Sequence, residues 1–506
     1  MTPATNIARS RLAQAKIPNS FLKRLPAQAW LFAFCLALLL TPGHRTMESP
    51  DTEALEHFLN TGEIGRDHHI NDMYLPGADG RHYPSHELGA DLVTLPIACI
   101  AKFAGGKFPF RRIFELELGF VAAFVFATTF VLAINLGIQL GVPPSFSLWH
   151  LLFLLVSSQY LVYGLHLADI SLACPFFIWT AILWVRIEAD PHIPKTWFLL
   201  GLSFGFLVLF KLSHLSLAPV LAFLAFRVMM RERSWLVPQV GAAITGALPA
   251  FILTGWWNWI RSGSPFRTLY IPAECDFIPR QFLRGLGGTL IGPGSSIFVY
   301  SPFLILAAPY LLKPSHVRLW NSVRILILGS LAVAIVRLSG MLVWSGVNGW
   351  GIRYYVAWVP VLAVLATVVW WQHQQSRLWR IAIWPLLVCG TLLNLAGTLA
   401  NWQYLEAPCG LPEWMSRMPV CSVTSLGDNV GRLFGSQKPD LVVATASKEL
   451  IFIANRLDVW WFAMRTQGVP QAFSWLVGLV LVVLLVLLAA RIHASNRYST
   501  PGGPVH

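Results

Sequence analysis

Long apolar segments recur along the whole chain, and short polar loops separate them. The most uniform segment, 475–490, reads WLVGLVLVVLLVLLAA and contains no charged residue. A helix needs roughly 20 apolar residues to cross the hydrocarbon core of a bilayer. Segments of about this length predict spanning helices at 25–43, 113–138, 147–164, 170–186, 197–213, 215–230, 236–257, 296–312, 325–343, 355–371, 380–400 and 472–490. The pattern predicts an all-α polytopic membrane protein with about 12 transmembrane helices.

One further apolar segment, 92–104, is too short to be assigned by length alone. If it lies on the membrane surface, the short loops rich in Lys and Arg fall on the inner side, as the positive-inside bias favours. If it spans, those loops all move outside. We therefore expect 92–104 to be interfacial and both chain ends to be inside. The outer face then holds 44–112, 258–295, 344–354 and 401–471.

The N-terminal segment carries five basic residues and no acidic residue up to the end of its first apolar run. This arrangement resembles a secretory signal, but the following residues 40–45, LTPGHR, contain no small-x-small cleavage site. We interpret the segment as an uncleaved anchor that keeps the N-terminus in the cytoplasm. We divide the chain into a transmembrane region at 1–400, an extracytoplasmic loop or small cap at 401–471, and a last helix with a cytoplasmic tail at 472–506.

Composition and charge agree with a membrane protein. Only 12% of the 506 residues are charged and 55% are hydrophobic, whereas a soluble domain carries about 25% charged residues. The net charge of +13 comes from basic residues scattered between apolar runs. Nucleic-acid binding needs such residues clustered on one face, so we expect no nucleic-acid partner and attribute the charge to membrane topology.

The seven cysteines point to no metal knuckle, because no CxxC motif is present. Four of them (Cys35, Cys99, Cys174 and Cys389) lie in apolar stretches. Cys409 and Cys421 share the outer segment 401–471, where an oxidising compartment would permit a disulfide. No internal repeat is visible, so the sequence lacks the best pointer to an inverted-repeat transporter.

The first outer loop contains a predicted amphipathic helix at 51–62 that lies on the membrane. Ser49 and Pro50 suit its N-terminus, and Gly62 can end it. Asp51 falls in the first turn of this helix. A carboxylate there can simply complement the helix dipole, or it can serve as a general base.

Three more charges are predicted at the outer ends of spanning segments: Asp169, Lys211 and Arg353. Charges at such positions are costly, and they usually pair with one another or line a cavity. The alternatives are a structural Asp–Lys pair, a snorkelling lysine or an interface anchor. With Asp51 they place two acids and two cations at one membrane level. A carboxylate can accept a proton from a hydroxyl there, while cations hold a phosphate leaving group.

Two other patterns in the outer loops leave their role open. A Gly-rich stretch at 285–296 lacks the Lys-Ser/Thr of a phosphate-binding loop. Arg280 and Arg284, just before it, either contact phosphate or belong to a solvated loop. The first outer loop also contains several residues of the types that bind divalent metals, so a metal site stays possible. These residues are His68, His69, His82, His86 and Glu87. Pro84 lies between His82 and His86 and argues against their forming a metal-binding face of a helix.

Four local patterns resemble the GT-C superfamily of integral-membrane glycosyltransferases, especially the protein O-mannosyltransferase and lipid A aminoarabinose transferase branch. They are the acid and amphipathic helix at 51–62, HLADISLA around Asp169, GLSFGFLVLFK ending in Lys211, and the pair GTLIGPGSSIFVYSPFLILAAP and GWGIRYYVAWVPVLA. They occur in family order over 48–365. The Lys-Pro motif of the aminoarabinose branch is absent, and HYPSHELG at 82–89 takes its place.

This resemblance implies a polyprenyl-phosphate sugar donor and a catalytic base in the first outer loop. It assigns the base role to Asp51, a supporting role to Asp169, and phosphate contact to Lys211 and Arg353. Glu48 or Glu53 can share or replace the role of Asp51. His166, in the Asp169 motif, and the arginines at 280 and 284 are further supporting candidates.

The sequence thus predicts an inverting membrane glycosyltransferase that acts on the outer face of a bacterial inner membrane. The donor is a polyprenyl-phosphate monosaccharide, and the acceptor is a hydroxyl on a lipid, glycan or protein. A transporter or lipid flippase is the alternative, since these proteins also place charges within apolar helices. A non-catalytic scaffold that binds partners through 401–471 is a third hypothesis.

Overall fold

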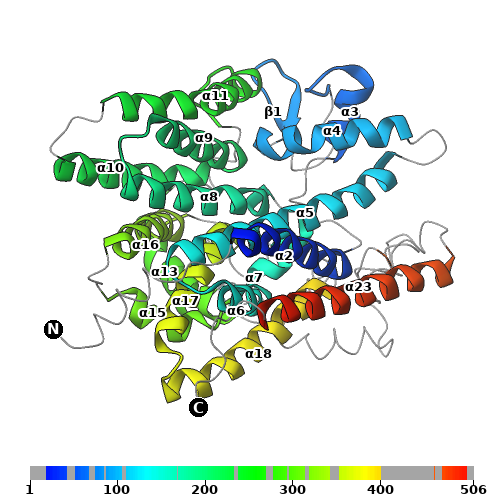
Figure 1. The fold of residues 1–506 in the computed structure, drawn as a ribbon. Coiled ribbons are helices and arrows are strands. Elements are labelled where there is room, and N and C mark those ends of the chain that lie inside the picture. The colour runs from blue at the N-terminus through cyan, green and yellow to red at the C-terminus, as the bar shows by residue number, and fades with distance from the viewer. Residues whose placement is uncertain are drawn as a thin grey trace, which may run out of the picture.

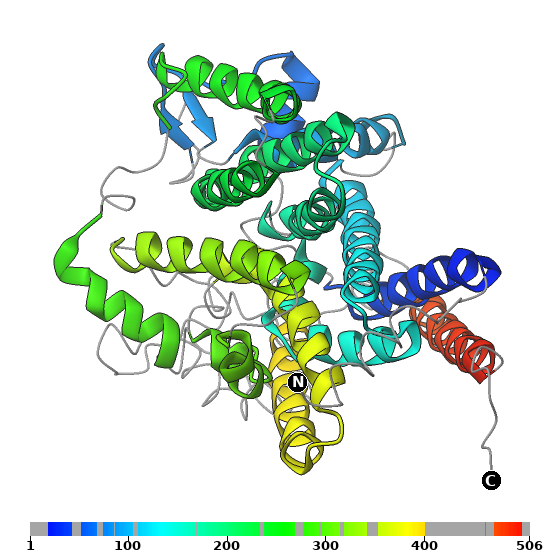
Figure 2. The same cartoon turned by 60° about the vertical axis from the view of Figure 1, so that its left-hand side comes forward.

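The computed structural model describes residues 19–42, 52–67, 74–84, 87–104, 110–167, 169–232, 237–268, 277–292, 296–313, 318–341, 353–399, 461 and 470–497. This part of the chain is almost entirely helical (Figures 1 and 2). Its one sheet is an antiparallel hairpin of β1 (Tyr74–Pro76) and β2 (His82–Pro84). Most of 401–471, with Cys409 and Cys421, lies outside the described residues.

Helices make up most of the described part of the chain. In chain order they are α2 (Asn19–Leu40), α3 (Thr52–Thr61), α4 (Leu88–Ala104), α5 (Phe110–Gln139), α6 (Pro144–Val156), α7 (Gln159–His166), α8 (Asp169–Ala189), α9 (Pro194–Phe210), η1 (Leu212–Leu217), α10 (Ala218–Glu232), α11 (Val237–Ser262), η2 (Pro279–Gln281), α13 (Phe282–Ile291), α14 (Ile297–Tyr300), α15 (Leu304–Leu311), α16 (Arg318–Ser339), η3 (Arg353–Trp358), α17 (Val359–His373), α18 (Arg377–Leu399) and α23 (Gln471–Arg497).

The described part contains eight helical segments long and apolar enough to cross a membrane, or nine if α6 and α7 count as one bent span. This confirms an all-α polytopic membrane protein. Helix is present at every predicted segment, but the described residues do not confirm the count of about 12 spans. Pro26–Leu40 and Pro194–Phe210 are short apolar helices, and the segment predicted at 296–312 is divided into α14 and α15.

The span predicted at 147–164 is not one straight helix, because α6 and α7 meet at an angle of 83°. Two buried serines form the break. The Ser157 hydroxyl donates to the Leu154 carbonyl at 3.1 Å, and the Ser158 hydroxyl caps α7 by accepting the Tyr160 N–H at 3.3 Å. These side chains satisfy backbone groups that a straight helix would pair internally.

Helices α9 and α11 pack at backbone contact. A Cβ added to Gly201 would overlap the Ala243 carbonyl, and one added to Gly246 would overlap the Phe198 carbonyl. A Cβ at Gly205 would lie 2.9 Å from the Ala250 side chain. Small residues allow such close approach between helices in lipid. Gly201 and Gly205 are therefore packing positions of this helix pair.

Burial divides the helices into a centre and a periphery. Helix α17 is almost completely enclosed and contacts α5, α6, α8 and α15. Helix α23 lies at the edge beside α2, where the indole of Trp461 donates to the Leu39 carbonyl at 2.9 Å (Figure 1). The apolar face of α23 is exposed, as expected for a helix surrounded by lipid.

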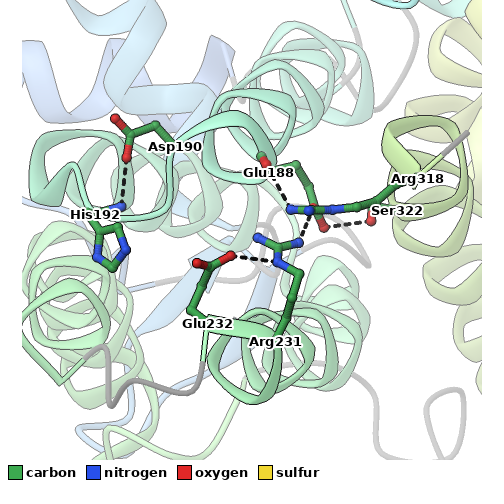
Figure 3. A network of polar contacts seen from close by, with 7 residues as sticks. All are labelled: Glu188, Asp190, His192, Arg231, Glu232, Arg318 and Ser322. Atoms are coloured by element: carbon green, nitrogen blue, oxygen red, sulfur yellow. Dashed lines mark hydrogen bonds and ion pairs between the residues drawn. The ribbon is translucent and has the colours of Figure 1, made fainter.

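One end of the bundle is held by an ionic network centred on Glu188, at the end of α8 (Figure 3). The buried carboxylate of Glu188 lies 2.7 Å from Arg231 of α10 and 2.8 Å from Arg318 of α16, and it accepts the Ser322 hydroxyl at 2.6 Å. Arg231 also pairs with Glu232 at 2.7 Å. The network joins two of the basic loops that the sequence places on one membrane face.

The opposite end of the same helices carries the short helix α3 and the hairpin of β1 and β2. Helix α3 occupies 52–61, close to the predicted 51–62, and Gly62 ends it with a φ of 75°. That left-handed conformation is the usual C-terminal stop of a helix. Figure 1 shows β1, α3 and α4 together near the ends of α9 and α11.

Candidate functional site

The site is built where α9 ends and η1 begins. Lys211 is extended (φ −154°, ψ 118°) and links the two helices, and its ammonium lies 3.6 Å from the carboxylate of Glu87. The other oxygen of Glu87 accepts the Leu212 N–H at 3.2 Å. A carboxylate is favoured there because the first N–H groups of a helix lack internal partners. Both side chains are mostly buried, at 15% and 8% exposure.

A second buried cation lies beside this pair. Arg261, at the end of α11, donates to the Pro84 carbonyl at 2.7 Å and to the Asn258 side chain at 3.0 Å. Its guanidinium is 4.7 Å from the Trp257 ring centre. The Arg261 carbonyl also accepts the Ala78 N–H at 3.0 Å, so Arg261 holds the turn of the hairpin as well as the end of β2.

These residues enclose a small cavity, which we call the polar pocket. Its lining comprises Glu87, Leu88, Leu209, Leu212, Thr254, Trp257, Asn258, Arg261 and Thr268. It joins the start of α4, the end of α9 and the end of α11. A carboxylate, an amide and a guanidinium thus converge within reach of the lysine at 211.

A larger apolar cavity is lined by Phe210, the residue before Lys211. Its volume is about 380 Å³, and Phe210 and Phe176 contribute to its wall. Val93 and Phe124 line it as well and are exposed on the surface, so the cavity opens toward lipid. The complete lining is Val93, Val121, Phe124, Val125, Thr128, Leu132, Leu172, Pro175, Phe176, Trp179 and Phe210. Such a wall suits a hydrocarbon chain rather than a polar ligand.

The turns that carry Lys211 and Arg353 are built alike and touch. Each cation stands at the start of a 3-10 helix, η1 or η3, that continues directly into a spanning helix. The ring of His214 in η1 lies 5.4 Å from the ring of Trp358 in η3, and the Trp358 indole donates to Ser330 of α16 at 2.9 Å. Arg353 itself lies over the Tyr354 ring at 5.4 Å. The structure therefore brings the two predicted cation turns into one region.

The predicted carboxylates are described only in part. Glu48 and Asp51 lie outside the described residues, and only the backbone is described at Glu53 and Asp169. Asp169 begins α8, which packs antiparallel to α9, so its backbone is at the same end as Lys211.

His166 is the buried last residue of α7, and its Nδ1 lies 2.7 Å from the Val162 carbonyl. It belongs to a strained turn. Leu167, which follows it, has a φ of 54°, a conformation that is unfavourable for a leucine. Strain of this kind often marks a position that the surrounding structure must enforce. The turn leads directly to the candidate acid at the start of α8.

Arg280 and Arg284 do not contribute to the polar pocket. They are exposed on η2 and α13, which pack against α16. A phosphate contact of these arginines, one of the two roles left open for them, would therefore belong to a different surface from that of Lys211.

The hairpin beside the pocket has a polar anchor of its own. Tyr83 packs against Gly65 and Gly77, and its hydroxyl donates to Asp79 at 2.7 Å. This hydrogen bond lowers the pKa of Asp79. Burial, followed by the Asp79 hydrogen bond and charge, raises the pKa of Tyr83 to about 12.

The histidines considered as metal ligands form no described cluster. His82 is described, but His68, His69 and His86 are not. Within the described ranges, no group of three His, Cys, Asp or Glu side chains is placed to hold a metal ion.

Sequence reasoning missed the role of Glu87 as the partner of Lys211, and it missed Arg261 and Asn258 altogether. Asn258 and Arg261 had a readable signal, because they stand three apart on one helical face at the end of an apolar run. Glu87 had none, since it lies more than a hundred residues from its partner.

Comparison with protein-family models and with curated proteins finds no match for this chain.

Proposed function

We propose that this chain is a membrane glycosyltransferase that moves a monosaccharide from a polyprenyl-phosphate donor to a hydroxyl acceptor. The observation that carries the proposal is the place of Lys211. Phe210 before it lines the apolar cavity, and Leu212 after it lines the polar pocket. A lipid-linked phosphate needs an apolar cavity that its hydrocarbon chain can enter from the membrane, with buried polar groups next to that cavity for the phosphate.

In this proposal the apolar cavity holds the first isoprene units of the donor. Lys211 and Arg353 contact its phosphate from the two 3-10 turns. Glu87 holds Lys211 in place while no donor is bound, because an unpaired ammonium at this depth would be costly. The arriving phosphate then shares or replaces Glu87 as the partner of the lysine.

The transfer proceeds with inversion. Asp51 takes the proton of the acceptor hydroxyl, whose oxygen bonds to the anomeric carbon as the carbon–oxygen bond to phosphate breaks. Polyprenyl phosphate leaves with the bonding electrons, and one well-placed donor is worth about 3 kcal/mol toward that charge. Asp169 supports the base, and Glu48 or Glu53 can share its role. The acceptor is a lipid, a glycan or a protein.

We assign the Lys211 end of the bundle to the extracytoplasmic side of a bacterial inner membrane. The support is the basic character of the other end, where Arg231 and Arg318 meet at Glu188. Basic loops favour the cytoplasmic side. The reaction would then use a donor already moved to the outer leaflet.

The test compares cells that contain or lack the chain by mass spectrometry of envelope lipids, glycans and proteins. Loss of a hexose- or pentose-sized increment identifies sugar and acceptor together. Asp51→Asn and Lys211→Gln should each abolish that increment in protein that inserts at normal levels. The matched controls are Asp190→Asn and Lys313→Gln at the opposite end. Unchanged product in both test variants would overturn the proposal.

A transporter or flippase is the second candidate, and the break between α6 and α7 favours it. Discontinuous helices often form substrate sites near the midplane of transporters, and the bend at Ser157 and Ser158 is buried in the bundle. Lipid movement in proteoliposomes without sugar transfer, lost on replacement of Ser158 but not of Asp51, would select this function.

A further inference from the structure

The segment 277–292, which we call the α13 arm, packs mainly against the end of α16 within the described ranges. The Ile278 N–H donates to the Gly340 carbonyl at 2.6 Å, and a Cβ on Gly285 would overlap the Ser339 carbonyl. Thr289 is buried on the same side. The arm is thus held against the end of α16, and Figure 2 shows it at the left edge of the molecule.

The other side of the arm is apolar and uncovered in the part of the chain that the structure describes. Leu283 is 77% exposed and Ile291 81%. Helix α13 has ten residues, a length of about 15 Å, which is half of what a bilayer core requires. It therefore cannot span the membrane, and its exposed leucine and isoleucine need an apolar surrounding at one membrane level.

Two cations border this apolar surface. Arg280 and Arg284 are four residues apart and exposed. No ion pair or hydrogen bond of either guanidinium occurs within the described ranges, and 277–292 contains no acidic residue. The arm packs at the end of α16 opposite Arg318, so its charges lie far from the Glu188 network.

We propose that the α13 arm is an interfacial docking surface for anionic phospholipids. Leu283 and Ile291 enter the acyl region, while Arg280 and Arg284 pair with headgroup phosphates. Charge complementarity selects this occupant, because an apolar ridge bordered by two exposed arginines matches the boundary between acyl chains and an anionic headgroup layer. This inference does not depend on the proposed glycosyltransferase activity.

The experiment identifies the lipids that contact the α13 arm in the full chain. A photo-crosslinking amino acid replaces Leu283 in protein reconstituted into vesicles of phosphatidylglycerol and phosphatidylcholine, and mass spectrometry identifies the crosslinked lipid. Phosphatidylglycerol should be enriched over its mole fraction. Each arginine near an anionic surface contributes about fivefold, so Arg280→Gln/Arg284→Gln should reduce the ratio of phosphatidylglycerol to phosphatidylcholine crosslinks by up to about 25-fold.

The matched control is Arg377→Gln/Arg380→Gln on α18, a pair of exposed arginines outside the arm. It should leave the enrichment at position 283 unchanged. A crosslinker at Leu378, exposed on the same helix, should give the same lipid profile in wild type and in the arm variant, which shows that the variant is folded.

Three results would overturn the proposal. Crosslinks in proportion to mole fraction would exclude anionic selectivity, and a crosslink to protein would identify a different occupant. Competition by inorganic phosphate at matched ionic strength would show a simple anion site rather than a lipid surface.

Discussion

Glu87 and Lys211 form a mostly buried ion pair that joins the start of α4 to the end of α9, with 3.6 Å between carboxylate and ammonium. The pair changes how the lysine must be interpreted. Its charge is already compensated, and one Glu87 oxygen also caps η1 through the Leu212 N–H. A phosphate at this position would therefore enter a nearly neutral site and exchange with a carboxylate.

Replacing one residue of this pair should destabilise the protein more than the loss of the pair as a whole would suggest. Removing one partner leaves the other charge buried, at a cost of about 3 kcal/mol. Glu87→Gln and Lys211→Gln should each lower the thermal midpoint, and the double variant should recover part of the loss. A double-mutant cycle of unfolding in detergent measures the coupling. Additive losses would contradict a direct interaction.

The contact between α9 and α11 should tolerate no side chain at its closest positions. Gly201→Leu or Gly246→Val places atoms where the Ala243 or Phe198 carbonyl lies, so the helices must separate. We expect a loss of more than about 3 kcal/mol, seen as aggregation in size-exclusion chromatography. Gly241→Ala on the same helix is the control, because nothing lies within 4 Å of its added methyl.

Substitution of Glu188, at the centre of its ionic network, should lower the stability of the protein more than substitution of Glu232, at the edge of the network. Glu188→Gln removes the charge that faces Arg231 and Arg318. Glu232→Gln removes only one partner of Arg231, on the partly exposed side. We expect a loss of about 3 kcal/mol for the first variant and under about 1 kcal/mol for the second. Equal thermal midpoints for the two would show that burial does not matter here.

The hairpin should respond to pH through Tyr83 and Asp79. The pKa of Tyr83 is raised from 10.0 to about 12, so its contribution is complete below pH 10 and is lost as the pH rises through about 12. The pKa of Asp79 is lowered, so its contribution is present above its ordinary pKa and is lost as the pH falls through the lowered value. Stability from this pair is therefore greatest between the two ranges.

Ultraviolet titration of tyrosinate tests the upper range. The wild-type curve should contain one late step near pH 12 that is absent in Tyr83→Phe. Asp79→Asn should move this step to lower pH, because the carboxylate that disfavours tyrosinate is gone. An unchanged late step in Tyr83→Phe would assign it to another tyrosine.

Several features of the fold follow from local sequence patterns, because each depends on neighbours in the chain. The apolar segments locate the helices, the N-terminal signals locate α3, and the spacing of Gly201 and Gly205 identifies a packing face. Segments 147–164 and 296–312 have span-like composition, but each is divided into two helices, α6 and α7 or α14 and α15. At 147–164 the hydroxyls of Ser157 and Ser158 bond to backbone groups at the break, and hydropathy does not encode such a break.

The sequence by itself determined that this is a helical membrane protein and which charges stand at helix ends, because hydropathy and helix period act over one or two turns. Only the tertiary structure decided the partners of those charges. Glu87 pairs with Lys211, which is more than a hundred residues away in the sequence. Arg261 donates a hydrogen bond to the β1–β2 hairpin, and the ring of His214 packs against that of Trp358. Such pairings depend on how helices pack in three dimensions, which local patterns do not encode.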